Sequence, residues 1–303
     1  MELRQLQYFL ALAELGSFRL ASERVHVTQQ AVSKSIAQLE ARIGARLFER
    51  DGRSVRLTPV GELLLPHARQ VTAELKHFEH EHDAYRGSRS GRLAIGSTPT
   101  LLGSVVPEVL RGLHRKHPRL VIAVMSGDWQ VLSERLLRGE LDVVVSTEPV
   151  GFVPEDVEVE KLCDEYNVVL AARDHPLVGT RPTPRQLHRS SWIGIDRLPR
   201  AEADLQRYFA AARLKAPIPR IRTEVTAFAR AWVEASDYLC VLPSRAVARS
   251  MKRGNLTTLD VELTETPWSL VAAYRRRAIR TPAMVAFLDA LRAALREPAR
   301  SVR

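Results

Sequence analysis

The sequence predicts an α/β protein in three parts: a winged helix-turn-helix, a long linker helix and a two-lobed α/β domain. Three observations carry this prediction. Two short capped helical patterns precede a hairpin turn, an apolar row with steps of four and three follows, and strands alternate with helices from residue 91. We place the domains at residues 1–58, 59–90 and 91–303, with lobe I comprising 91–162 and 268–303 and lobe II comprising 163–267.

The N-terminal part begins with a helical pattern from Leu3 to Leu15, and two further short helices then start at hydroxyl caps. Ser17 and Thr28 can each accept hydrogen bonds from the free N–H groups of the helix that follows. Gly44 is a natural left-handed end for the second of these helices. That helix has one apolar face, because Val32, Ile36, Leu39 and Ile43 recur at steps of four, three and four.

The other face of the helix after Thr28 carries amide, hydroxyl and ammonium groups. Such side chains suit base edges and phosphates in a DNA major groove, and a helix-turn-helix presents them in this way. An ordinary amphipathic hairpin with a solvated polar face is the competing interpretation. The side chains on this polar face that we expect to contact DNA are Gln29, Gln30, Ser33 and Lys34.

A predicted hairpin directly after these helices favours DNA binding over that alternative. The segment from Phe48 to Leu57 turns at Asp51-Gly52, a dipeptide typical of two-residue hairpin loops. Three arginines on this wing would flank the groove and neutralise phosphates. They are Arg50, Arg53 and Arg56.

Residues 1 to about 90 resemble the winged helix-turn-helix of LysR-type transcriptional regulators, and the likeness continues over the whole chain in length and layout. The resemblance implies double-stranded DNA, a small-molecule effector and RNA polymerase as partners, and assembly into a tetramer. The family usually has proline after the glutamine that opens the recognition helix, whereas Gln30 adds a base-reading amide here. The matching residues are Leu3 to Phe9, Gly16-Ser17-Phe18, Ala21, Thr28-Gln29, Ser33, Leu39-Glu40, Gly44, Leu47-Phe48-Glu49-Arg50, Thr58-Pro59 and Gly61.

The chain of 303 residues carries a formal net charge of +10, which fits a nucleic-acid partner. Residues 1–90 hold 13 Lys/Arg and 11 Asp/Glu, a net charge of +2, so the remaining +8 lies in residues 91–303. DNA binding is therefore inferred from where the cations stand. We attribute the C-terminal excess to a general preference for arginine, although it would also aid approach to DNA or attract an anionic effector.

No apolar run approaches the length of a membrane span, and the start Met1-Glu2-Leu3-Arg4 lacks a signal-peptide pattern. We therefore expect a cytoplasmic protein with no membrane partner. Cys163 and Cys240 stand far apart without metal-ligand spacing. Two buried, reduced thiols are favoured over a redox-sensing pair.

A long helix is predicted to begin at Thr58-Pro59 and to run to about Tyr85. Its apolar row has the unbroken spacing of a coiled-coil seam, and a flexible linker composition follows at 86–91. We expect dimerisation through this helix, with packing on its own domain as the alternative. Three histidines between residues 77 and 82 do not converge, so no metal site is predicted. The row is Leu64, Ala68, Val71, Leu75, Phe78, His82 and Tyr85.

From Arg92 onward, short buried strands alternate with helices, which indicates parallel α/β architecture. Two units joined by two crossings resemble the periplasmic-type solute-binding domains of the LysR effector region. Strands are predicted at 93–96, 120–125, 142–146, 166–172, 192–195, 221–225, 238–242 and 269–274, and helices at 100–117, 131–138, 201–213, 226–235 and 281–295.

Hydroxyl and charged side chains follow several of these strands, at the edge where open α/β sheets bind ligands. The hydroxyls after the first strand stand at a predicted helix start, which favours polar or anionic groups. For Ser97 and Thr98 the resemblance also implies contact with the inducer. The predicted effector-binding residues are Ser97, Thr98, Thr100, Asp128, Trp129 and Thr147 in lobe I, and Arg197 and Thr226 in lobe II.

Some of these residues have simpler explanations. Helix capping alone would account for Thr100, Asp128 and Thr226. An acid at Asp128 would repel a simple carboxylate effector or pair with an amine. Trp129 is expected either to pack in the core or to form a lid over an aromatic or sugar-like ligand.

The sequence lacks the nucleophile-elbow motif, the phosphate-binding glycine-rich loop and metal-ligand spacings. We therefore expect neither an enzyme nor a protein with a cofactor. Two functions remain: an effector-responsive transcription regulator, and a constitutive repressor or architectural DNA-binding protein whose C-terminal domain only oligomerises. We favour the first, and stabilisation against heat by a metabolite would distinguish them.

Overall fold

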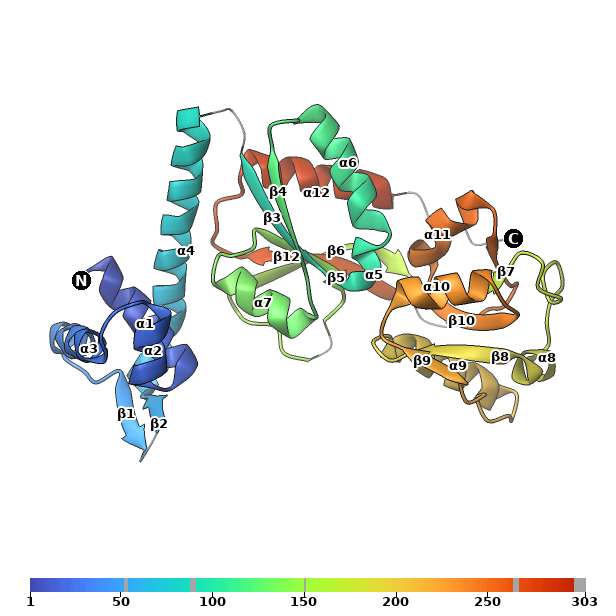
Figure 1. Cartoon of the computed structure of the whole chain (residues 1–303), viewed down its shortest axis with the longest axis horizontal. Coiled ribbons are helices and arrows are strands. Elements are labelled where there is room, and N and C mark those ends of the chain that lie inside the picture. Colours follow the sequence, from blue (N-terminus) through green and yellow to red (C-terminus); the bar gives the residue numbers. More distant parts are fainter. Residues whose placement is uncertain (52–53, 88–90, 150, 264–266, 297–303) are drawn as a thin grey trace.

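The computed structural model describes residues 1–51, 54–87, 91–149, 151–263 and 267–296. A small helical domain with a two-stranded hairpin comes first, a long helix follows, and two α/β lobes lie beside each other at the far side (Figure 1). Within those ranges, no helix combines the length and the apolar character needed to cross a membrane.

The N-terminal domain confirms the predicted caps. Thr28 Oγ1 accepts a hydrogen bond from the Ala31 N–H at 3.2 Å. Ser17 likewise caps the helix that begins at Phe18, by accepting the Leu20 N–H. Gly44 ends the recognition helix with φ of 78°. The elements are α1 (Leu3–Leu15), α2 (Phe18–Arg24), α3 (Gln29–Ile43), β1 (Phe48–Asp51) and β2 (Ser54–Leu57).

The hairpin β1–β2 is tied to the helices by two sets of hydrogen bonds. The Glu40 carboxylate of α3 accepts the Leu47 N–H at 2.7 Å and the Phe48 N–H at 3.2 Å. The Val55 N–H of β2 donates to the carbonyl of Gly16 at 3.0 Å, at the end of α1. The wing is therefore held in a fixed place relative to the recognition helix.

Helix α4 (Pro59–Gly87) starts at the predicted cap, since Thr58 Oγ1 accepts the Gly61 N–H at 3.1 Å. Its apolar row divides into two parts. Leu64 and Ala68 pack into the core of the N-terminal domain, whereas Val71 and Phe78 are exposed. Packing on its own domain thus accounts for the first two members of the row. The side chains of His82 and Tyr85 lie outside the described part.

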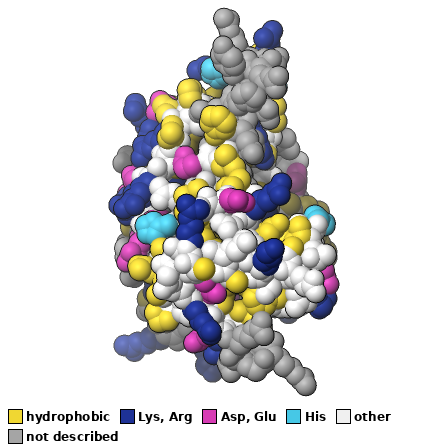
Figure 2. Space-filling model, turned by 90° about the vertical axis from the view of Figure 1, so that its left-hand side faces the viewer, with side chains coloured by type: hydrophobic (Ala, Val, Ile, Leu, Met, Phe, Trp, Pro, Cys, Tyr) yellow, Lys and Arg dark blue, Asp and Glu magenta, His cyan; other side chains and the backbone are white. Residues whose placement is uncertain are grey.

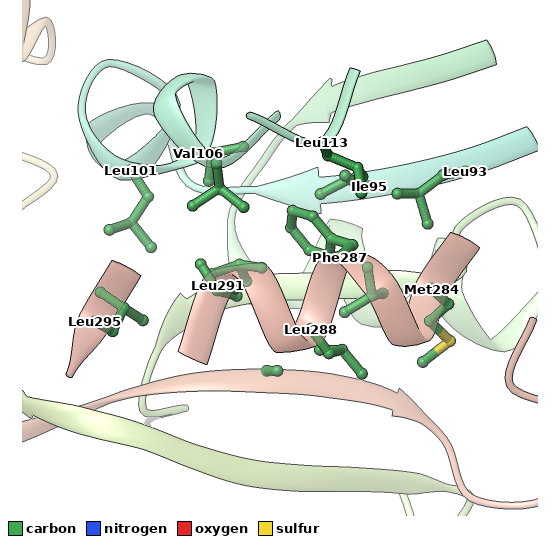
Figure 3. Packing of buried hydrophobic residues seen from close by; sticks show 14 of the residues in the cluster. Leu93, Ile95, Leu101, Val106, Leu113, Met284, Phe287, Leu288, Leu291 and Leu295 are labelled. Atoms are coloured by element: carbon green, nitrogen blue, oxygen red, sulfur yellow. The ribbon is translucent and has the colours of Figure 1, made fainter. Parts of the chain in front are cut away.

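Lobe I is a mixed five-stranded sheet with strand order β4-β3-β5-β12-β6. Strands β3, β4 and β5 are parallel, and β12 runs antiparallel to both of its neighbours. Helices α6 and α12 pack on one face over a core that includes Leu93, Ile95, Val106 and Phe287 (Figure 3). The elements are β3 (Arg92–Ser97), α5 (Pro99–Leu102), α6 (Val105–Lys116), β4 (Val121–Ser126), α7 (Trp129–Leu137), β5 (Val143–Thr147), β6 (Val157–Glu165), β12 (Trp268–Arg275) and α12 (Pro282–Leu295).

Lobe II is a second five-stranded sheet, with strand order β11-β7-β10-β8-β9. Strands β8, β9 and β10 are parallel, and β7 is antiparallel to β10 and β11. The elements are β7 (Asn167–Ala172), α8 (Pro184–Arg189), β8 (Ser191–Ile195), α9 (Pro199–Ala211), β9 (Ile221–Thr223), α10 (Thr226–Glu234), β10 (Tyr238–Pro243), α11 (Ser244–Arg253) and β11 (Leu256–Thr258).

Two expectations about the lobes are wrong. Residues 163–165, predicted to open lobe II, pair with β12 in the sheet of lobe I. The expected parallel arrangement is confirmed for β3, β4 and β5 and is repeated in β8, β9 and β10, whereas the crossing segments add antiparallel strands to each sheet. The single helix predicted over 100–117 is interrupted around Gly103, giving α5 and α6. Strand β6 was missed because its charged residues alternate along a half-exposed edge strand, where no apolar run marks it.

The edge strand β6 is held to α12 by a bidentate ion pair. Arg292 Nε donates to Glu160 Oε1 at 2.8 Å and Arg292 Nη2 to Oε2 at 2.9 Å. These hydrogen bonds lower the pKa of Glu160 below its ordinary value. A depressed carboxyl pKa stabilises the fold above the unfolded-state pKa, and this stabilisation is lost as the pH falls through the folded-state pKa.

We therefore expect Glu160→Gln to lower the free energy of unfolding at pH 7 by about 1–2 kcal/mol. Denaturant unfolding over a series of pH values measures the effect, which should shrink as the pH falls through the lowered folded-state pKa of Glu160, because the wild-type carboxyl then becomes protonated. Asp164→Asn is the control, because it removes an exposed ion pair to Lys161 on the same strand and should change little. An equal loss at all pH values would contradict the role given to the carboxylate.

Candidate DNA-binding and effector sites

The outer face of α3 presents the predicted base-reading side chains to solvent. Gln29, Gln30 and Lys34 are exposed and Ser33 is half-buried, while the apolar residues of the opposite face are buried in the domain core. This division follows directly from the helical period of the sequence. The helix is therefore anchored on one side and open to a partner on the other.

On the wing, Arg56 is exposed and lies opposite Glu49 in the β1–β2 register. Arg53 and the side chain of Arg50 lie outside the described residues. Figure 2 shows this end of the molecule, with Lys and Arg side chains spread over it and acidic side chains between them. That mixture agrees with the small net charge of residues 1–90, so the position of each cation matters more than the total.

A cavity of about 120 Å³ lies where the two lobes meet. It collects six of the eight predicted effector-binding residues, from strand ends and helix starts of both lobes. These six are Thr98, Thr100, Asp128 and Thr147 from lobe I, and Arg197 and Thr226 from lobe II.

Four threonines line this cavity, and three of them, Thr98, Thr100 and Thr226, stand at helix starts without forming a capping hydrogen bond. Thr100 Oγ1 and Thr226 Oγ1 lie 3.3 Å apart and form a hydrogen bond across the lobes. Thr98 precedes α5, yet its side chain makes no capping bond, and its Oγ1 is buried without a hydrogen-bond partner among the described residues. Because a buried unsatisfied hydroxyl costs about 1–3 kcal/mol, this group calls for a partner that the described residues do not supply, either a water molecule or a ligand atom.

Arg197 of lobe II lies between two acidic residues of the cavity, Asp128 of lobe I and Glu224 of its own lobe. Asp128 caps α7 by accepting the Val131 N–H at 3.0 Å, so the capping explanation is correct for this residue. Its Oδ2 also lies 3.8 Å from Arg197 Nη2, and Arg197 Nε lies 4.0 Å from Glu224 Oε2. About half of each side chain is exposed, so these pairs are weak and can rearrange.

Two predicted residues do not reach the cavity. Ser97 is fully buried, and its Oγ donates to the carbonyl of Val145 on β5 at 2.6 Å, so it serves the sheet. Trp129 packs against the cluster of Leu132 and Leu136, and its Nε1–H donates to the Phe152 carbonyl at 3.2 Å. Trp129 is half-buried and lies outside the interlobe cavity, which favours the packing alternative over the lid.

Three polar residues of the cavity were missed by sequence reasoning, Glu165, Glu224 and Trp268. Glu165 and Trp268 stand where the chain crosses between lobes, at the end of β6 and the start of β12. Trp268 is 6% exposed, and its Nε1–H has no hydrogen-bond partner among the described residues. A more accurate position for the two crossings would have identified Glu165 and Trp268.

Glu165 is almost completely buried and is fixed from lobe II. Its carboxylate accepts hydrogen bonds from the Tyr166 N–H at 3.0 Å and from Ser244 Oγ. Burial nevertheless raises the pKa of Glu165 above its ordinary value. The floor of the cavity therefore carries a carboxyl that accepts a proton more readily than a solvated one.

The two cysteines lie in different sheets, Cys163 half-buried in lobe I and Cys240 fully buried in lobe II. Burial raises the pKa of Cys240 to about 12 and also raises the pKa of Cys163. Thiolate is the reactive form, so neither group is activated for oxidation. Across the described ranges, no group of His, Cys, Asp or Glu side chains is arranged to hold a metal ion.

Comparison with known proteins matches both halves of the chain. The model of the bacterial regulatory helix-turn-helix protein, lysR family, matches residues 3–62, and the LysR substrate binding domain matches residues 86–296. The chain is 28% identical over 300 residues to the HTH-type transcriptional regulator GalR of Pseudomonas putida, covering 98% of this chain and 75% of that protein. It is 31% identical over 264 residues to the SDS degradation transcriptional activation protein of a Pseudomonas species, covering 86% and 85%.

A solved structure shares the arrangement of the whole chain. It is full-length OxyR from Pseudomonas aeruginosa with one cysteine replaced by aspartate, and it has a TM-score of 0.63 and 26% identity, covering 96% of this chain and 95% of that one. Together with the exposed recognition helix and the interlobe cavity, these matches identify the fold and its role. The chain belongs to the LysR family of transcriptional regulators.

Proposed function

We propose that this regulator is controlled by a small polar effector that binds in the cavity between the lobes. The observation that carries the proposal is the buried hydroxyl of Thr98, which lacks a partner among the described residues where hydroxyls from both lobes meet. A ligand oxygen or nitrogen at this point would satisfy Thr98 and bridge the Thr100–Thr226 contact. Binding across two lobes favours one lobe arrangement and shifts its population.

The charges around the cavity support an uncharged or cationic effector. Its lining has three acidic residues, Asp128, Glu165 and Glu224, and one basic residue, Arg197. A carboxylate beside Asp128 or Glu224 would meet like-charge repulsion that Arg197 offsets in part. Glu165, whose raised pKa favours the neutral form, adds less to this repulsion. The Trp268 N–H, which has no acceptor within the described ranges, adds a requirement for one acceptor atom on the effector.

Oxidant sensing through cysteine is not supported, because burial raises both thiol pKa values and neither cysteine lines the effector cavity. The constitutive alternative, in which the C-terminal domain only oligomerises, gives no reason for an unsatisfied hydroxyl inside a cavity. An effector-responsive regulator explains both the cavity and the hydroxyl.

Genome-wide mapping of bound DNA would identify neighbouring operons and thereby the metabolites to try. Thermal unfolding of the protein with each of these metabolites then tests the proposal. An uncharged or cationic metabolite at 100 times its dissociation constant should stabilise the protein by about 2.7 kcal/mol. Carboxylate analogues of the same shape should have no effect. If no metabolite class raises the melting temperature, or if only carboxylates do, the assignment of the cavity is wrong.

We further propose that DNA is bound by a dimer formed through α4, and that two dimers join through their effector domains in the cytoplasm, where the assembly contacts RNA polymerase. The seam spacing and the exposure of Val71 support the first interface. The second is supported by large apolar side chains exposed on both lobes: Val121 and Val124 on the edge strand β4, and Phe228 and Trp232 on α10. Exposed apolar patches of this kind mark protein interfaces.

We expect the double variant Leu75→Glu and Phe78→Glu to dissociate the α4 dimer, because each carboxylate would face its symmetry mate in an apolar seam. Light scattering would then report an assembly of half the mass. Glu62→Gln is the control, since it alters an exposed residue in the first turn of the same helix. An unchanged mass in the double variant would exclude α4 as the interface.

A further inference from the structure

Helix α7 joins the effector cavity to the N-terminal domain. Asp128, its N-cap, lines the cavity and lies 3.8 Å from Arg197 of lobe II. Arg138, its C-cap, has its Nε 2.7 Å from Glu14 Oε1 at the end of α1. Nine helical residues span about 14 Å. One rigid element therefore has one end at the cavity and the other at the domain that carries the recognition helix.

A second contact lies directly beside the end of α7. Gly139 has φ of 67° and approaches α4 so closely that a β-carbon on it would lie 2.6 Å from Cβ of Ala73. Ala73 is fully buried in the middle of α4. A third contact is formed by Arg275 of β12, whose buried guanidinium places Nη1 3.9 Å from Glu74 Oε1. Helix α4 is therefore seated on lobe I, beside α7, as Figure 1 shows.

The carboxylate of Glu14 is the electrostatic centre of this interface. It is 14% exposed and lies between Arg138 of lobe I and Arg24 of its own domain, at 2.7 and 2.9 Å. Arg69 of α4 lies nearby. Burial lowers the pKa of Arg69 below its ordinary value, and the negative charge of Glu14 offsets this effect only in part. Removing one partner from a partly buried group of this kind leaves a charge without compensation, which costs more than loss of a surface pair.

We propose that α7 couples the effector cavity to the orientation of the winged helix. The docking contact, which we define as the pairs Arg138–Glu14, Gly139–Ala73 and Arg275–Glu74, holds the N-terminal domain and α4 against lobe I. Closure of lobe II on an effector changes the position of Arg197 relative to Asp128. Because α7 moves as one body, Arg138 then shifts against Glu14 and the docking contact is weakened or strengthened.

The cavity half of this inference rests on the proposed function, whereas the docking contact stands without it. Coupling requires a contact that has two arrangements, and binding of effector and binding of DNA must each favour one of them. The structure shows one such arrangement of the docking contact, in which charge, close approach and burial act at one place. It gives the effector domain a direct connection to the DNA-binding domain of the same chain.

Hydrogen exchange on the full-length protein without effector tests the docking contact. Arg138→Glu should speed amide exchange at residues 70–75 and 134–139 by about tenfold or more and increase the radius of gyration in solution scattering. Arg135→Glu is the matched control, since it makes the same charge change one turn earlier in α7, away from Glu14. The double variant Glu14→Arg with Arg138→Glu should recover protection in part. Equal exchange in Arg138→Glu and Arg135→Glu would overturn the docking contact.

A second arm tests coupling through α7. Arg197→Ala removes the lobe II partner of Asp128, and we expect it to change exchange at residues 134–139 by about twofold or more. The same substitution should have no further effect when Arg138→Glu is already present. An effect of Arg197→Ala that is absent, or equal in both backgrounds, would overturn the coupling. Neither arm uses an effector, so metabolite stabilisation can succeed or fail independently of both.

Discussion

Thr98→Val is expected to abolish the transcriptional response to the effector and, at the same time, to raise the thermal stability of the effector-free protein. Valine has nearly the shape of threonine and lacks the hydroxyl, which is buried without a partner among the described residues. Removing an unsatisfied buried hydroxyl should stabilise the fold by about 1–3 kcal/mol. The same change removes the cavity hydroxyl that we propose as a partner of the effector.

A reporter assay, footprinting and thermal unfolding of wild type and Thr98→Val measure the three quantities. Thr281→Val is the control, because that hydroxyl caps α12 by accepting the Met284 N–H at 3.2 Å. Its removal should lower stability by about 1 kcal/mol and leave the effector response in place. The position of Thr98 outside the recognition helix and wing predicts an unchanged footprint. A normal response in Thr98→Val, or loss of the footprint, would contradict the separation of effector and DNA sites.

Gln29→Ala and Gln30→Ala are expected to reduce discrimination between the operator and mutated sites by about 1–3 kcal/mol for each lost bidentate base contact. Both side chains are exposed in the first turn of α3, where a recognition helix meets base edges. Gln30 replaces the proline usual in the family, so its removal should also change which base is preferred. Binding to a panel of operator variants measures this change.

Lys34→Ala should behave differently, because a phosphate contact lowers affinity for all sequences alike. The slope of log affinity against log salt should fall by about 0.9 for one phosphate lost. Gln206→Ala, on an exposed surface of lobe II, serves as the control for both classes. Unaltered discrimination in the two glutamine variants would show that α3 does not read bases through these side chains.

Much of the N-terminal domain could be predicted from the sequence because its signals are local. Ser17, Thr28 and Thr58 cap helices whose first residues are a few positions away, and Gly44 ends α3 by its own backbone preference. The faces of α3 follow from the helical period alone. The order of strands and helices after residue 91 was likewise marked by buried apolar runs at most positions.

The effector site was predicted in part, since strand ends could be located but side-chain directions could not. Ser97 and Thr98 are neighbours in the chain, yet one bonds into the sheet and the other faces the cavity. That difference depends on the partner strand β5, whose Val145 is 48 residues away along the chain. Edge strand β6 gave no apolar run, so the position of the first crossing, and with it Glu165, was missed.

The sequence by itself therefore determined the DNA-binding domain, the linker helix and the family, because caps, helical periods and turn dipeptides act within a few residues. Tertiary structure decided which of the predicted side chains share the interlobe cavity, which hydroxyl is left without a partner among the described residues, and how Arg138 meets Glu14. These features depend on strand order and on contacts between residues far apart along the chain. No local propensity encodes such contacts. They form only when the two lobes, which the chain connects at two crossings, pack against each other.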